Sequence, residues 1–196
     1  MPRIVDSEAQ REAVLVATWR TIAQHGIAGA TVRRIASEAG VSTGFISHYF
    51  RDKKEVLAAA LTLSNERSQR RVSARAEGRR GLSALRAVIE AVLPLDEERR
   101  LEWLIWVTFW GSAGADAALA REWRSGRDGW RDTIVQRLEE AKLDGEVHAT
   151  IDVEHEADRL VLLVVGLGLH ERSGRFRRRA LVFIDEHLQT LIKLQE

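Results

Sequence analysis

The chain of 196 residues is 45% apolar and 30% charged, with two prolines and no cysteine. A chain of this length and composition forms a sizeable core, and the absence of cysteine excludes disulfides, thiol nucleophiles and cysteine-ligated zinc. Thirty basic side chains balance 29 acidic ones, so any affinity for nucleic acid must come from local placement of charge.

The sequence carries no sign of export or of membrane insertion. Its first ten residues, MPRIVDSEAQ, lack the apolar core of a signal peptide. The longest apolar run, Leu160–Leu169, has ten residues, about half of the length that spans a bilayer. We therefore expect a cytoplasmic protein.

Apolar side chains recur every three or four residues along almost the whole chain, which predicts an all-α fold. The first helix is expected at about Ser7–Gly26, because Ser7 opens the spacing of a capping box. Thr31 then caps a second helix over Val32–Ala39, and Gly40 ends it.

Two further helices follow within a few residues. Ser42 caps a short third helix, and Asp52 with Glu55 has capping-box spacing at the start of a fourth helix over about Lys53–Ala76. Two short helices joined at a glycine turn form the pattern of a helix-turn-helix. A plain helical hairpin with a solvated basic face fits this spacing as well.

The third helix is expected to have an inner and an outer face. Val41, Ile46 and Phe50 can pack inward on the second helix. The outer face then carries side chains and backbone able to contact base edges or phosphates: Thr43, Gly44, Ser47, His48 and Tyr49. Between residues 30 and 54, five basic residues against two acidic ones leave a local charge of +3, which favours phosphate binding.

The run TVRRIASEAGVSTGFISHYFRDKKEVL resembles the DNA-binding region of the TetR family of bacterial one-component repressors. The resemblance covers about residues 7 to 60 and includes the pattern IAxxAGVS at Ile35–Ser42, Gly44, and the Tyr49–Phe50 pair. The segment ISHYF is most similar to the branch of choline-responsive betaine regulators. Ser47 stands where many members carry tyrosine, so the resemblance implies no base preference.

The resemblance also implies roles for single residues. The family's phosphate contacts fall on four positions of this chain: Thr31, Ser42, Tyr49 and Lys53. Its base-edge contacts fall on five: Thr43, Gly44, Phe45, Ser47 and His48. Arg33, in the basic segment, completes the predicted DNA-binding set.

By the same resemblance the chain has about nine helices in two domains. Residues 1–52 would form an N-terminal three-helix bundle that binds DNA, residues 53–79 a connecting fourth helix, and residues 80–196 a larger helical domain for ligand binding and dimerisation. The segment Leu101–Gly114 is apolar almost all round, as in an enclosed helix, and Gly111 and Gly114 break or kink it. The next helix, over residues 119–145, carries two tryptophans about two turns apart.

The tryptophans of these two helices either fill the core or line a pocket for a small molecule. Together with the resemblance they predict a pocket lined by at least two of them. The predicted effector-binding set is Trp103, Trp106, Trp110, Trp123, Trp130 and Leu167.

Indole faces bind apolar or cationic groups, so the effector is expected to be cationic or lipophilic. Choline or another quaternary amine, a polyamine and a neutral lipophilic metabolite all stay open. Glu102 can serve as counter-charge to a cation, although an exposed glutamate at a helix start is the simpler expectation. Val165 stands where relatives often place an aspartate, which weakens the case for a cation.

The last two helices are expected at about Asp152–Glu171 and Arg175–Leu194, and they resemble the pair that forms the family's dimer. The predicted interface is Leu160, Leu163, Gly166, Leu167, Phe183, Ile184, His187, Leu188 and Leu191. Packing within one chain would use the same residues. A symmetric dimer places two recognition helices about 34 Å apart, which matches a palindromic operator.

Enzyme signatures are missing: the chain has no GxSxG elbow, no glycine-rich phosphate loop and no HExxH. The segment VHATIDVEHEAD gathers histidines and acids, and it is more simply an acidic helix start than a metal site. We therefore predict that the chain is not an enzyme and has no catalytic residue, no cofactor and no metal site. The predicted function is a homodimeric repressor that leaves its operator when an effector binds; an activator, or a binding protein or enzyme with a vestigial DNA module, is the alternative.

Overall fold

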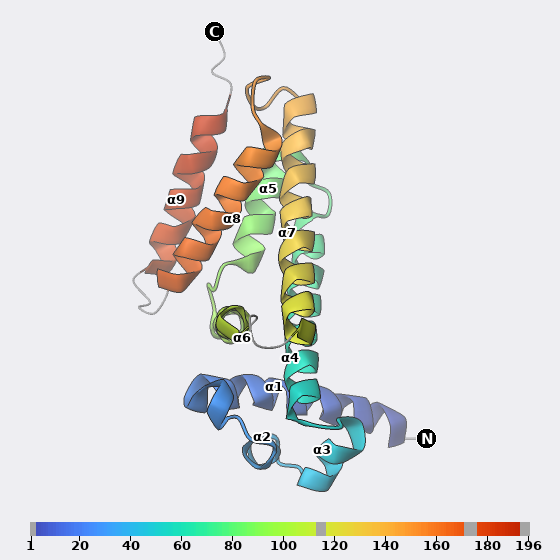
Figure 1. Ribbon diagram of the computed structural model, residues 1–196. Coiled ribbons are helices and arrows are strands. Elements are labelled where there is room, and N and C mark those ends of the chain that lie inside the picture. The colour runs from blue at the N-terminus through green and yellow to red at the C-terminus, as the bar shows by residue number, and fades with distance from the viewer. Residues whose placement is uncertain (1–2, 113–116, 171–175, 193–196) are drawn as a thin grey trace. The chain divides into compact units, whose positions relative to one another are not determined.

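The computed structural model describes residues 3–112, 117–170 and 176–192, and these residues form nine α-helices and no strand (Figure 1). The helices are α1 (Arg3–Gly29), α2 (Val32–Ala39), α3 (Thr43–Tyr49), α4 (Lys53–Ala76), α5 (Gly81–Val92), α6 (Glu97–Ser112), α7 (Ala117–Leu143), α8 (Val153–His170) and α9 (Phe176–Leu191). The predicted all-α fold is confirmed. None of the described helices is long and apolar enough to cross a bilayer.

The predicted helix bounds are met closely in the first half of the chain. Helices α2 and α4 have the expected limits. Helix α1 is longer than the predicted Ser7–Gly26, because residues 3–6 are helical and the helix resumes for one turn beyond Gly26. Gly26 itself leaves helical geometry at φ 67° and ψ 173°, so the last turn of α1 is kinked away from the rest.

The helices pack as two compact units, each with its own core. One unit comprises Met1–Glu66 and Arg100–Arg124, and the other comprises Arg67–Arg99 and Ser125–Glu196. Helix α6 thus packs with the N-terminal helices. The domain limits at residues 52 and 79 stay a prediction.

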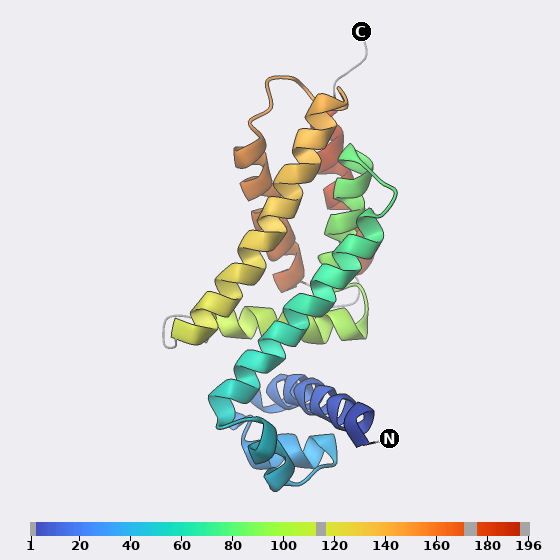
Figure 2. The ribbon, with the colours of Figure 1, turned by 90° about the vertical axis from the view of Figure 1, so that its right-hand side faces the viewer.

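The first unit contains α1, α2, α3 and parts of α4, α6 and α7 (Figure 2). Side chains from all six helices form its core. Trp19 of α1 is fully buried, and its indole N–H donates a hydrogen bond to the Ala60 carbonyl of α4 at 3.0 Å. Ile105 and Phe109 of α6 join the same core. The buried side chains of α6 therefore pack directly on the helices that carry the helix-turn-helix.

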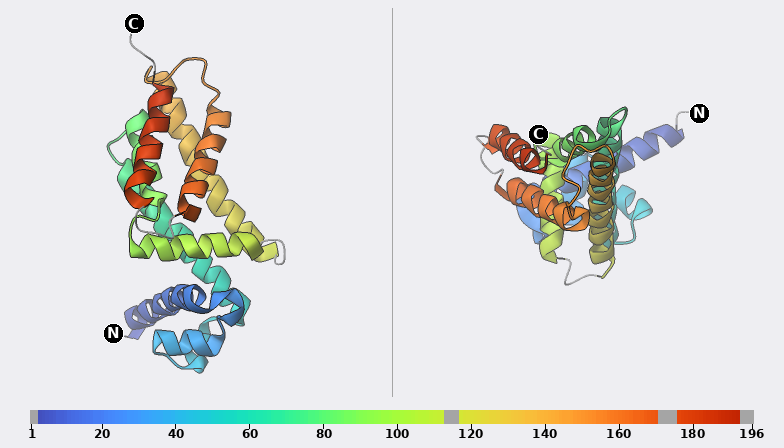
Figure 3. Two further views of the ribbon diagram at one scale, coloured as in Figure 1. Left: turned by 90° about the vertical axis from the view of Figure 1, so that its left-hand side faces the viewer. Right: turned by 90° about the horizontal axis from the view of Figure 1, so that it is seen from above.

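The second unit contains α5, α8, α9 and most of α7 (Figure 3), and ion pairs join these helices. Arg86 of α5 binds Asp185 of α9 at 2.6 Å, and Arg131 of α7 binds Asp158 of α8 at the same distance. Between α8 and α9, the buried Glu156 carboxylate lies 2.5 Å from His187 Nε2. The Glu156–His187 contact joins the last two helices to each other, and the other two ion pairs join them to α5 and α7.

Candidate nucleic-acid interface

The turn between α2 and α3 is built by the residues that the sequence indicates. Thr31 Oγ1 accepts a hydrogen bond from the Arg34 N–H at 3.3 Å, and Ser42 Oγ accepts one from the Phe45 N–H at 3.1 Å. Gly40 ends α2 at φ 67°, a left-handed conformation that costs glycine little. Both short helices are therefore capped at their first turn, and the prediction of these caps is confirmed.

Helix α3 has the two faces expected of a recognition helix. Ile46 and Phe50 are buried in the core of the first unit, and Val41 is half-buried against it. Four residues of the predicted base-contacting set are exposed: Thr43, Gly44, Ser47 and His48.

Two aromatic side chains of α3 are half-buried rather than fully outward. The ring centroid of Tyr49 lies 4.9 Å from that of Phe45 and also 4.9 Å from that of His48. The three rings form a row along α3. Phe45 and Tyr49 both pack against the core, so each has less free surface for DNA than the exposed His48.

The residues predicted to contact phosphates differ in what they already bind. Arg33 is exposed, and the hydroxyls of Thr31 and Ser42 keep their own hydrogens for donation because their oxygens accept in the caps. The Lys53 ammonium lies 2.6 Å from the Ile27 carbonyl oxygen and 3.3 Å from that of Ala28. Its charge is therefore directed at the end of α1.

Three of the predicted effector-binding tryptophans form a stack between α6 and α7 in the first unit. The ring centroids of Trp103 and Trp106 are 5.5 Å apart at an interplanar angle of 25°, and those of Trp106 and Trp123 are 5.1 Å apart. Trp130 instead packs against Val72, Val88 and Ala91.

The remaining members of that predicted set are placed differently. Leu167 is buried within α8. The side chain of Trp110 lies outside the described residues, as does Gly114, one of the two glycines predicted to break or kink this helix.

Glu102 is buried, with 4% of its surface exposed, which corrects the expectation that it is an exposed glutamate at a helix start. The reason is that α6 begins at Glu97, one turn earlier than the sequence pattern indicates, so Glu102 lies within the helix. A buried carboxylate requires hydrogen bonds or a cation. Glu102 has an interaction of this kind within the chain itself.

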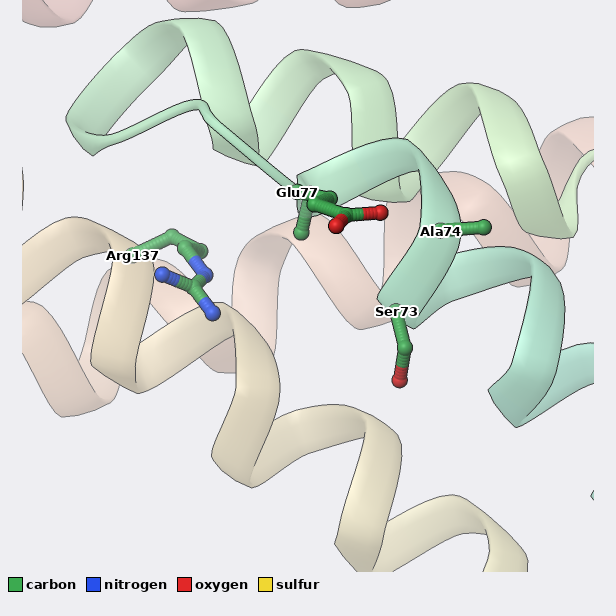
Figure 4. A pocket seen from close by; sticks show the side chains of 5 residues that line it. Ser73, Ala74, Glu77 and Arg137 are labelled. Carbon is green, nitrogen blue, oxygen red and sulfur yellow. The ribbon is translucent and has the colours of Figure 1, made fainter.

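A hollow of about 420 Å³ lies between the end of α4 and α7 in the second unit (Figure 4). No pattern in the sequence predicts it. It is lined by Ser73, Ala74, Ala76, Glu77 and Arg137. The guanidinium of Arg137 binds the Glu140 carboxylate at 2.7 and 2.9 Å. None of the predicted effector-binding residues lines this hollow.

The predicted dimer interface stays a prediction, and its residues differ in burial within the protomer. Five of them are buried there: Leu160, Leu167, Ile184, Leu188 and Leu191. The large exposed apolar side chains of α8 and α9 are Leu162, Leu169, Val182 and Phe183. Helical periodicity alone could not separate the face of α8 and α9 that packs internally from the face that stays exposed.

The segment with histidines and acids is accounted for by structural contacts. Asp152 Oδ1 accepts from the His155 N–H at 3.1 Å at the start of α8, Asp158 binds Arg131, and Glu156 binds His187. Among the described residues, no group of three histidine, aspartate or glutamate side chains is arranged to hold a metal ion.

Comparison with known proteins covers both halves of the chain. Residues 14–60 match the family "Bacterial regulatory proteins, tetR family", and residues 82–193 match "BetI-type transcriptional repressor, C-terminal". The HTH-type transcriptional regulator PksA of Bacillus subtilis is 34% identical over 173 residues, which cover 87% of this chain and 82% of PksA. BetI of Paraburkholderia phytofirmans is 36% identical over 118 residues, covering 58% of this chain and 59% of BetI.

Solved structures share the whole architecture. A transcriptional regulator from Saccharomonospora viridis in complex with choline has a TM-score of 0.82 at 26% identity, covering 95% of this chain and 99% of that one. A TetR-family transcriptional regulator from Rhodococcus sp. has a TM-score of 0.75 at 28% identity, covering 94% and 98%.

Proposed function

Because the chain belongs to the TetR family, with a C-terminal part of the BetI repressor type, we propose that it leaves a palindromic operator when a small organic cation binds beside α6. It is a DNA-binding transcriptional regulator and not an enzyme. Regulators of this family bind DNA and small-molecule effectors, typically as dimers, and release by an effector is typical of them. For this chain we propose which residues contact DNA, the effector and the second copy, which effector binds, and that the protein is cytoplasmic.

The observation that carries the DNA-binding proposal is the exposed face of α3. Ser47 and His48 present hydrogen-bonding groups there, and Thr43 presents a methyl group and a hydroxyl. An exposed polar face on a helix of seven residues, held by a capped turn, fits a major groove about 12 Å wide. Tyr49, at the end of the same helix, has a hydroxyl that can donate to a phosphate.

The dimer is proposed to form through the exposed side of α8 and α9. Leu162, Leu169, Val182 and Phe183 are large apolar side chains that a second copy would cover. Leu163, Gly166 and His187 are half-buried at the edge of this surface and stay in the proposed interface. Pairing two copies about a two-fold axis presents two α3 helices, as a palindrome requires.

The effector is proposed to be a quaternary amine. Stacked indoles and one buried carboxylate, those of Trp103, Trp106 and Glu102, supply the attractive faces and the counter-charge that such a cation needs. The choline bound by the Saccharomonospora viridis relative supports this class.

Coupling between effector and DNA is proposed to pass through packing within the first unit. Trp123 belongs to the same core as Ile46 of α3 and Leu61 of α4, and Trp106 packs against that core. A ligand that moves these indoles therefore changes the packing beneath the helix-turn-helix. By linkage, an effector that weakens operator binding by a given factor is itself bound more weakly by that factor on DNA.

The proposal is tested by selecting DNA fragments with the purified protein and then adding choline or tetramethylammonium. We expect a sequence-selective complex that dissociates at a defined concentration of one of these cations. Trp106→Leu should abolish this release while operator binding persists, because it removes the central indole of the stack. Trp130→Leu is the matched control, since Trp130 packs elsewhere, and it should keep the release. Release that survives Trp106→Leu in a folded protein would contradict the proposed effector site.

A further inference from the structure

The last turn of α1 ends in three consecutive backbone carbonyls that accept hydrogen bonds from cationic side chains. Lys53 Nζ lies 2.6 Å from the Ile27 oxygen and 3.3 Å from the Ala28 oxygen. A guanidinium nitrogen of Arg34 donates to the Gly29 oxygen at 2.9 Å. Lys53 comes from the start of α4 and Arg34 from α2, so three helices meet at this point.

These contacts answer a physical need of α1. The final carbonyls of a helix have no partner within the helix and carry a partial negative charge. The Ile27 and Gly29 oxygens each also accept a backbone N–H, from Ala30 at 3.3 Å and from Thr31 at 2.9 Å, and the cationic side chains add to these bonds. Two cations supply charge-assisted hydrogen bonds, which are among the stronger ones available.

The local sequence is fitted to the Arg34 contact. A β-carbon added to Gly29 would lie 3.3 Å from the Arg34 guanidinium nitrogen and 2.8 Å from the β-carbon of His25. Glycine at this position therefore lets the guanidinium reach the backbone. Lys53 is half-buried, so its ammonium is partly enclosed by the protein.

We propose that Lys53 and Arg34 are positioning residues that lock the end of α1 to α2 and α4 and thereby set the orientation of α3, instead of binding DNA phosphates. This inference rests on the proposed DNA-binding function, and it changes the role that sequence resemblance implies for Lys53. Of the five basic residues between 30 and 54, two are then committed to backbone carbonyls. A third, Arg51, binds the Glu55 carboxylate at 3.2 Å. We expect Arg33 and Lys54, both exposed, to bind phosphates.

Two pairs of neighbouring residues give matched variants. Lys53→Met and Lys54→Met each remove one charge from the same turn of α4, and Arg34→Met and Arg33→Met do so in α2. The measurements are the melting temperature of the free protein and the slope of log K against log salt for a selected operator. The slope counts phosphate contacts, and each lost contact lowers it by about 1.

For Lys53→Met and Arg34→Met we expect a lower melting temperature and roughly fivefold weaker operator binding with the salt slope of the parent protein. For Arg33→Met we expect an unchanged melting temperature, and for both Arg33→Met and Lys54→Met we expect a slope smaller by about 1 per protomer. A reduced slope with an unchanged melting temperature in Lys53→Met and in Arg34→Met would overturn the inference. If Lys53→Met does not fold, the Arg34→Met variant still tests the inference, because Arg34 is exposed.

If the proposed DNA-binding function itself is wrong, these measurements give a different result. In that case the parent protein itself would show no sequence-selective binding, whereas the melting temperatures would still report whether the two cations stabilise the fold.

Discussion

The ring of Tyr49 leans on Phe45 and His48 at the end of α3, so one side of the phenol is packed. Removing the hydroxyl alone leaves this packing in place, which makes the substitution to phenylalanine a clean probe of the proposed phosphate contact.

Tyr49→Phe should weaken operator binding without lowering the melting temperature. A lost hydrogen bond is worth about 1 kcal/mol, which is roughly a fivefold increase in Kd for each protomer. Fluorescence anisotropy with a labelled operator measures the change, and circular dichroism checks the fold. Unchanged affinity would remove the Tyr49 hydroxyl from the interface.

Gly40 and Gly81 both have positive φ, 67° and 56°, but their surroundings differ. A β-carbon at Gly40 would meet nothing within 4 Å, whereas at Gly81 it would lie 2.1 Å from Glu146 Oε2. That oxygen accepts from the Leu82 N–H at 2.7 Å at the start of α5.

Gly40→Ala should therefore cost about 1–2 kcal/mol of unfolding free energy from backbone strain alone. Gly81→Ala should cost about 1 kcal/mol more, because Glu146 must also give up its bond to the first turn of α5. Urea unfolding of both variants measures the difference. An equal cost in the two variants would show that Glu146 contributes no stability.

At the scale of the element, the start of α4 depends on a carboxylate with a lowered pKa. Asp52 Oδ1 accepts from the Glu55 N–H at 3.0 Å, as the capping-box spacing predicts. The Glu55 carboxylate returns to the N–H of Arg51, at 2.7 Å, rather than to that of Asp52. The backbone N–H and the guanidinium of Arg51 together lower the pKa of Glu55.

Because its pKa is lower in the folded state, ionised Glu55 stabilises the protein above its unfolded pKa, and this contribution is lost as pH falls through the folded value. Glu55→Gln should therefore lower the melting temperature at pH 7 but have little effect near pH 3. Thermal unfolding at both values measures this. If the melting temperatures of the parent protein and of Glu55→Gln differ by the same amount at both pH values, the charge of Glu55 has no role.

Short-range signals allowed the N-terminal helices to be predicted from the sequence. The features that the sequence did not predict depend on packing between residues far apart in the chain. Caps such as Thr31 and Ser42 act within three residues, so their pattern is visible in the sequence. The burial of Glu102 and the separation of Trp130 from the other tryptophans depend on which helices meet. Periodicity gives one apolar stripe for α8 and cannot tell how much of it faces α9.

At the scale of the whole molecule, the exposed apolar side chains of α8 and α9 make dimerisation testable. Leu162 is 70% exposed and Val182 is 51% exposed, and burying such side chains drives association. Leu143, at the end of α7, is 78% exposed and offers a control outside these two helices.

Leu162→Arg and Val182→Arg should each shift the protein from dimer toward monomer, because an unpaired cation would be buried in the interface. Sedimentation at several protein concentrations measures the dissociation constant. Leu143→Arg should leave the dimer intact. A dimer that withstands both substitutions in α8 and α9 would move the interface to another surface.

The central claim is that two copies of α3 enter successive major grooves of one operator. Hydroxyl-radical footprinting on a selected DNA fragment tests it most directly. We predict two protected segments whose centres are about 10 base pairs apart, symmetric about the centre of a palindrome, and both lost in His48→Ala. A single unsymmetric footprint, or protection that His48→Ala leaves intact, would contradict this account.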